Sequence, residues 1–347
     1  MAKTIEKLSE SEKIIKSLTG QVGVDKKTLI NAIAKLRNSK TDFNADIKIL
    51  GRKLYEILLD NGLNESDIIN IERLMDKIEG FVYQGQHEKA LEILEVLDSQ
   101  QTFVPFNKNG ERIYCITNFL EAYFIKNELG NVSVKNVDFQ LSARTIILTK
   151  KFQILFESGK EREAQAVLNQ ILLINPADFN ANLYKSIFFQ GNLIKFKNQI
   201  LKSYDFAFCK QHIIEIYKNL AVYYELNKEY VNAYFMLNAI CLFDDISLVE
   251  NDLKRLEVEI NKTSYGKFKT PTPDQMIRFI NKEKIPLTIK ESTFDAICNS
   301  YVELLIQDDE DSAEFCRNLI IELTGNDTEL LKSLEKVAKE EREKGGK

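Results

Sequence analysis

The sequence predicts an all-α protein, and three observations support this prediction. The chain has only 14 Gly and 5 Pro in 347 residues, too few breakers for a many-turned β fold or for repeated βα turns. Apolar residues recur at the three- and four-residue spacing of amphipathic helices. The chain is 44% hydrophobic and 29% charged, with a net charge of −5. It can therefore bury a core, and no overall positive charge indicates nucleic acid as a partner.

Residues 1–62 predict a helical N-terminal cap of three helices. Apolar residues from Ile5 to Leu18 support the first helix, and those from Ile47 to Leu58 support the third. The second begins after Asp25, whose carboxylate can cap the free amides of the first turn.

Residues 63–262 predict paired helices with short breaks, interrupted by an irregular insertion near 100–141. Residues 130–141 read as a loop within this insertion. The expected helices lie at about 66–84, 87–99, 111–128, 142–158, 160–174, 178–190, 192–205, 210–226, 229–243 and 246–261.

Residues 263–347 predict a helical C-terminal extension. Two of the five prolines lie in 262–273, which reads as a linker. Thr272 is placed to cap a helix with Pro273 at its first position. The expected helices are 273–283, 291–307, 310–324 and 327–344.

An internal repeat marks the middle of the chain. Three segments share a small alanine, preceded five residues earlier by a breaker or polar residue and followed at four and seven residues by apolar ones. These alanines are Ala90, Ala164 and Ala233. The spacing places the apolar residues on the alanine's helix face, where a small side chain lets a second helix approach closely.

With these residues the chain resembles the tetratricopeptide repeat (TPR) family over roughly residues 66–247. That family repeats a helix–turn–helix of about 34 residues. The best-matching unit is 214–247, through Tyr217, Leu220, Ala221, Tyr224, Tyr230 and Ala233. Phe152 and Phe196 stand where the family prefers a small residue. The resemblance implies a right-handed superhelical solenoid of helix–turn–helix repeats.

The resemblance also implies a non-catalytic function. TPR proteins bind a partner peptide in a concave groove lined by the first helix of each repeat, and act as scaffolds, adaptors or chaperones. The implied groove residues are Met75, Glu79, Val82, Thr149, Gln153, Phe156, Leu183, Ile187, Glu215, Lys218, Val222 and Glu225.

Residues suited to catalysis or cofactor binding are scarce. The two histidines, His87 and His212, have no metal-ligand spacing to another Cys or His. Cys209 and His212 could pair as nucleophile and base, but no orienting acid accompanies them. No phosphate-binding glycine motif occurs. We therefore expect no catalytic residues, metal or cofactor, and no enzyme activity.

The basic N-terminal part of the chain, which we call the head, suggests an alternative function. Residues 1–55 hold 12 basic and 6 acidic side chains, a charge of +6. Residues 18–29 faintly resemble a helix-turn-helix, which would face DNA with Lys26, Lys27 and Thr28. The alternative is therefore a TPR-containing transcriptional regulator, although a plain helical cap also explains the lysines.

Location and partners follow from the remaining features. The N-terminus has no apolar signal segment, and no apolar run reaches membrane-spanning length. The five cysteines show no C-x-x-C spacing and suit a reducing compartment. We expect a cytoplasmic protein without membrane insertion that binds a protein or peptide, or a second copy of itself, rather than nucleic acid.

Overall fold

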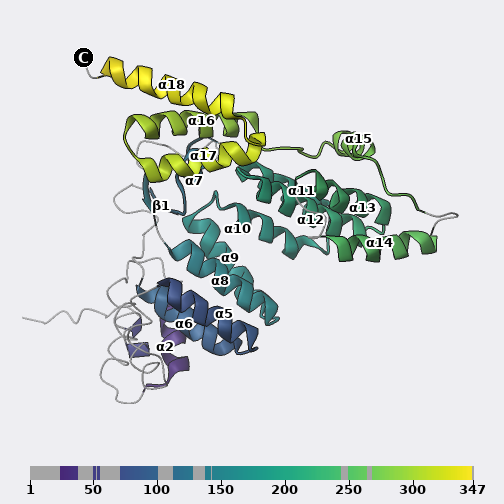
Figure 1. The fold of residues 1–347 in the computed structure, drawn as a ribbon. Coiled ribbons are helices and arrows are strands. Elements are labelled where there is room, and N and C mark those ends of the chain that lie inside the picture. The colour runs from purple at the N-terminus through teal and green to yellow at the C-terminus, as the bar shows by residue number, and fades with distance from the viewer. Residues whose placement is uncertain are drawn as a thin grey trace, which may run out of the picture. The chain divides into compact units, whose positions relative to one another are not determined.

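The described chain divides into two compact units, and Figure 1 shows its elements coloured in chain order. The computed structural model describes residues 24–37, 50–51, 53–54, 71–100, 112–127, 137–141, 143–243, 249–263 and 268–345. Unit 1 takes its described residues from Met1–Thr117 and Ser133–Asn175, and unit 2 takes them from Asn118–Val132 and Pro176–Lys347. The boundary at Asn175 falls inside the expected 63–262 array, so this division differs from the expected one.

Almost all of the described chain is helical, which confirms the fold class at that level. The exception is a two-stranded parallel sheet in unit 1, with Arg112 of β1 (Arg112–Ile116) opposite Val137 of β2 (Val137–Leu141). The expected helix at 111–128 is therefore wrong in its first part and becomes β1 followed by α7 (Phe119–Asn127). The loop expected at 130–141 ends in β2.

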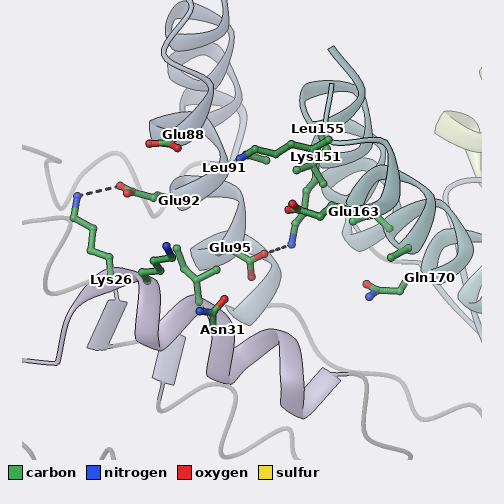
Figure 2. Close-up of a pocket in the computed structure, with 15 residues that line it drawn as sticks. Lys26, Asn31, Glu88, Leu91, Glu92, Glu95, Lys151, Leu155, Glu163 and Gln170 are labelled. Carbon is green, nitrogen blue, oxygen red and sulfur yellow. Dashed lines mark hydrogen bonds and ion pairs between the residues drawn. The ribbon is translucent and has the colours of Figure 1, made fainter. Parts of the chain in front are cut away.

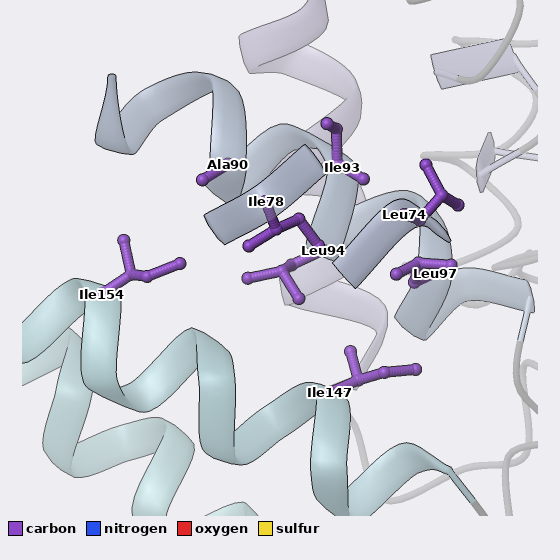
Figure 3. Close-up of a cluster of buried hydrophobic side chains, with 8 residues drawn as sticks. All are labelled: Leu74, Ile78, Ala90, Ile93, Leu94, Leu97, Ile147 and Ile154. Carbon is purple, nitrogen blue, oxygen red and sulfur yellow. The ribbon is translucent and has the colours of Figure 1, made fainter. Parts of the chain in front are cut away.

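Unit 1 is built on two helix pairs. These are α5 (Ile71–Tyr83) with α6 (His87–Gln100), and α8 (Arg144–Glu157) with α9 (Glu161–Ile174). The apolar faces of α5, α6 and α8 meet in one buried cluster (Figure 3), made of Leu74, Ile78, Ala90, Ile93, Leu94, Leu97, Ile147 and Ile154. Helix α2 (Lys26–Arg37) packs against α6. The first expected helix, at 1–18, and most of the third lie outside the described residues.

Ion pairs reinforce the seam between α6 and α8. The Arg144 guanidinium donates to Asp98 over 2.9 Å, and both side chains are almost fully buried. Lys151 pairs with Glu95, whose side chain is 3% exposed. Buried charges must be paired, because their desolvation is costly. These pairs therefore set how α8 meets α6.

Unit 2 contains the remaining helices. They are α7, α10 (Phe179–Tyr184), α11 (Leu193–Ser203), α12 (Lys210–Leu226), α13 (Tyr230–Ala239), α14 (Glu250–Thr263), α15 (Pro273–Glu283), α16 (Glu291–Ile306), α17 (Glu310–Thr324) and α18 (Thr328–Gly345). The 3₁₀ turns Lys185–Phe189, Tyr204–Phe206 and Ile240–Leu242 extend α10, α11 and α13.

Four helix pairs share one turn. Gly85, Gly159, Lys228 and Asp308 each have a φ between 59° and 70°, the left-handed region that ends helices. The next residue's amide donates to the carbonyl five residues earlier, for example Lys160 to Leu155 over 2.9 Å. This Schellman geometry joins α5 to α6, α8 to α9, α12 to α13, and α16 to α17.

A buried alanine follows each of these turns by five residues. Ala90, Ala164 and Ala233 are fully buried, and Ala313 of α17 is 3% exposed. The residues three and seven positions after each alanine are buried as well. The structure thus extends the sequence pattern to a fourth pair, α16–α17, which the sequence reading placed in the C-terminal extension.

Two expected helix caps are confirmed. Asp25 accepts the Thr28 amide at 3.0 Å and the Thr28 hydroxyl at 2.7 Å. Thr272 and Gln275 form a reciprocal capping box, with Pro273 at the first helical position. Short polar side chains beside helix starts were therefore reliable signals of where these helices begin.

Candidate functional site

Most of the groove residues expected in unit 1 make contacts within the unit. Met75 and Val82 pack against the buried cluster of α5, α6 and α8. The Glu79 carboxylate pairs with Lys150 of α8. The Phe156 ring stacks on Phe152 at 6.0 Å. Thr149 and Gln153 are half-buried on α8.

The groove residues expected in unit 2 differ among themselves. Leu183 is 2% exposed, so its assignment to an open groove is wrong: α10 turns this side chain into the core. Ile187 is half-buried in the following 3₁₀ turn. Lys218 pairs with Glu215 over 3.0 Å. Glu225 receives two hydrogen bonds from Arg255, and Val222 is 40% exposed.

A well-formed concavity lies elsewhere, in unit 1. It is a pocket of about 580 Å³ between α2, α6, α8 and α9 (Figure 2). Its apolar lining comes from Ile30, Leu91, Leu155, Ala166 and Val167. This volume falls in the range of pockets that bind ligands in proteins, roughly 300–1,000 Å³. None of the expected groove residues lines it.

Charged side chains of both signs surround this apolar lining. The lysines are Lys26, Lys27, Lys151 and Lys160, and the glutamates are Glu88, Glu92, Glu95 and Glu163. Figure 2 shows the two internal ion pairs, Lys26 with Glu92 at 3.2 Å and Lys151 with Glu95. We call the whole lining the charged pocket.

Four of these charges are left available within the described chain. The side chains of Lys27, Lys160, Glu88 and Glu163 make no ion pair with another described residue. Each stands at or near the start of its helix. The charged pocket thus offers two cations and two anions to a ligand, around an apolar floor.

Two of the three residues assigned to DNA in the alternative reading, Lys26 and Lys27, line this pocket. Lys26 is paired with Glu92, and Lys27 lines the pocket beside it. The Thr28 hydroxyl donates to Asp25 within the helix cap. The structure therefore gives Lys26 and Thr28 intramolecular partners.

The Cys209–His212 pair has the opposite electrostatics to a nucleophile–base couple. Burial raises the pKa of the Cys209 thiol to about 11 and lowers the pKa of His212 to about 3. His212 Nδ1 accepts the Phe208 amide at 3.3 Å, and its ring stacks on Phe179 at 3.7 Å. An activated cysteine requires a lowered thiol pKa, and the pKa shifts of these two residues run in the opposite direction.

Two other features are absent from the part of the chain that the structure describes. No group of three or more His, Cys, Asp or Glu side chains there could hold a metal ion. No described helix is both long and apolar enough to cross a bilayer.

Sequence reasoning missed the charged pocket because the repeat pattern directs attention to the first helix of each pair. The pocket is lined mainly by the second helices, α6 and α9, and by α2. A signal was present in the sequence. Glu88, Glu92 and Glu95 recur at helical spacing on α6, so they share one face.

Comparisons with known proteins identify no relative. No protein-family model, curated protein or solved structure matched the chain. The resemblance to TPR proteins is therefore neither supported nor contradicted by these comparisons.

Proposed function

We propose that the chain is a non-catalytic protein-binding scaffold whose charged pocket holds a short segment of a partner protein. The observation that carries the proposal is the apolar floor flanked by available charges of both signs. Apolar anchors supply affinity, and oppositely placed charges select orientation and partner. The favoured ligand is a peptide with an apolar side chain between an acidic and a basic residue.

The repeated helix pairs support a scaffold role as an adaptor or chaperone. Four pairs, two in each unit, have the same turn geometry and the same buried alanine position, so the packing within each pair is fixed. Rigid receptors lose little conformational entropy on binding. We further propose that these pairs are TPR-like repeats, as the residues of 214–247 suggest, and that the protein works in the cytoplasm. The five cysteines form no disulfide with one another, which suits a reducing compartment.

Selection from a random peptide library against the full chain tests the proposal. Ala166 is exposed and lines the charged pocket, so Ala166→Arg blocks the pocket without disturbing the core. The matched control is Gln165→Arg, at the exposed neighbouring position outside the pocket. We expect selected peptides to lose at least tenfold in affinity for Ala166→Arg and to bind Gln165→Arg normally.

The charges provide a second, independent measurement. Lys160→Glu should weaken the binding of selected peptides, because it places a negative charge opposite their acidic residue. Replacing that acidic residue of the peptide by lysine should restore binding. Failure to select any peptide would contradict the proposal, as would equal binding to both position variants.

A further inference from the structure

Within unit 2, helix α15 lies against α13 in the manner of a bound ligand. It is not a member of any of the four helix pairs. Non-helical stretches at 268–272 and 284–290 flank it (Figure 1). Its own ends are complete, with a capping box at Thr272 and a left-handed Lys284. A segment that carries its own start and stop signals depends less on its surroundings to be helical.

Four residues of α15, at positions i, i+3, i+4 and i+7, are buried or bonded to the helices beneath it. Met276 accepts a hydrogen bond from the Asn238 amide to its sulfur at 2.9 Å. The Phe279 ring lies 5.0 Å from Phe235, and Ile280 is fully buried. Glu283 occupies the fourth position. This is the anchor spacing of an amphipathic helix seated on a helical receptor.

Glu283 is held by a specific polar socket. Its Oε2 accepts the Tyr224 hydroxyl at 2.9 Å and lies 3.1 Å from the Lys197 ammonium. That ammonium also stands over the rings of Tyr223 and Tyr224, 5.3 and 5.4 Å from their centres. Charge-assisted hydrogen bonds of this kind recognise a carboxylate specifically.

The opposite face of α15 makes few contacts. Gln275, Arg278 and Lys282 are exposed, and Ile277 is 36% exposed. Only Met276 and Ile280 of the whole helix are buried. A helix with so little buried surface opens locally at lower free energy than the helices of a pair.

We propose that the face of α11, α12 and α13 beneath α15 is a receptor for amphipathic helices, and that α15 is its ligand held in cis. The partner is a helix with apolar residues at i, i+3 and i+4 and a carboxylate at i+7. Such a helix competes with α15 for Lys197 and Tyr224. This surface is distinct from the charged pocket, so each proposal can fail without the other.

Competition in cis explains how such a receptor would be kept closed. A short tether gives an effective concentration on the order of millimolar, against which a free partner must compete. The apparent affinity for a partner is reduced by the fraction of molecules in which the receptor is open. Weakening α15 should therefore tighten binding of an added helix.

The test measures binding of a labelled peptide of residues 270–288 to the full chain. The opened variant combines Phe279→Ala with Glu283→Ala, and the control combines Arg278→Ala with Lys282→Ala on the exposed face. We expect the opened variant to bind the peptide at least tenfold more tightly than the unaltered chain, and the control to match the unaltered chain. Adding Lys197→Glu should abolish this binding, and a peptide carrying Glu283→Lys should restore it.

Hydrogen exchange on the unaltered chain gives a second measurement that needs no variant. We expect the amides of α15 to exchange through local opening while those of α12 and α13 stay protected. Exchange of α15 only with global unfolding would overturn the proposal. So would a folded opened variant that binds no peptide.

Discussion

Asp178 and His212 should give unit 2 two opposing responses to pH. Asp178 caps α10 by accepting the Ala181 amide at 2.6 Å, and it is 7% exposed. Burial, together with the charge of buried Glu121, raises its pKa from 3.8 to about 7. Burial between Phe179 and Phe208 lowers the pKa of His212 from 6.5 to about 3.

The two shifts act on stability with opposite signs. For Asp178 the folded state binds the proton more tightly, so its contribution is full below pH 3.8 and is lost as pH rises to about 7. For His212 the unfolded state binds the proton more tightly, so its contribution is full above pH 6.5 and is lost as pH falls towards 3. Each slope is at most about 1.4 kcal/mol per pH unit. At pH values between the ordinary pKa values of the two groups, the two slopes of unfolding free energy against pH largely cancel.

Between the two ordinary pKa values, the free energy of unfolding of the unaltered chain should therefore change little with pH through these two groups. A single substitution at either position should make it depend on pH. Asp178→Asn keeps a capping oxygen and removes only the acid, so the free energy of unfolding should rise with pH by up to roughly 3 kcal/mol over the overlap of the two windows. His212→Gln should tilt it by a similar amount in the other direction. The double variant should return to the slope of the unaltered chain, whatever its absolute stability.

Denaturant unfolding at half-unit pH steps measures these slopes, and differences between variants remove pH effects common to all. NMR titration adds a direct reading, because the chain has only two histidines. His212 should stay neutral throughout the native pH range. Parallel profiles for all four proteins, or titration of His212 near 6.5, would refute the reasoning.

The remaining predictions concern stability and can be measured by denaturant unfolding of the full chain. Gly159→Ala should cost about 1 kcal/mol through backbone strain alone, because an added Cβ would meet no atom within 4 Å; no loss would contradict the left-handed turn. Lys228→Gly should raise the free energy of unfolding by about 0.5 kcal/mol, because glycine adopts the left-handed conformation without strain. A lower free energy of unfolding would contradict this explanation. Asp98→Ala should cost about 3–5 kcal/mol, because it strands the buried Arg144 charge; adding Arg144→Leu should recover much of this, and strict additivity would contradict the buried pair.

Local signals predicted the helices well. The start of α15 was predicted from Thr272 and Pro273, and α12 was predicted at the bounds observed. Caps, breakers and apolar periodicity all act within one turn of a helix, so the sequence alone contains them. The buried alanines were likewise predicted, because their role depends on spacing within one helix pair.

Non-local contacts could not be predicted in the same way. Residues 112–116 form a strand only because 137–141 pair with them in parallel, across 25 residues of chain. No local pattern records such a partner, and the apolar residues there suit a helix equally well. Leu183 was misassigned for a related reason, since the burial of its side chain depends on neighbours outside α10.

The repeat pattern determines how the two helices of a pair pack together, but it does not determine which outer surface of the pair another helix covers. In each unit a helix that belongs to no pair covers part of that surface. Helix α2 lies against α6 and joins it through Lys26 and Glu92, which narrows the charged pocket. Helix α15 lies against α13 and is joined to α11 through Glu283 and Lys197. A lysine–glutamate pair between half-exposed side chains is worth only about 1 kcal/mol or less. Either ion pair can therefore be exchanged for an ion pair with a partner at little cost. The proposed binding surfaces therefore lie at the pairs' outer faces, where sequence periodicity is least informative.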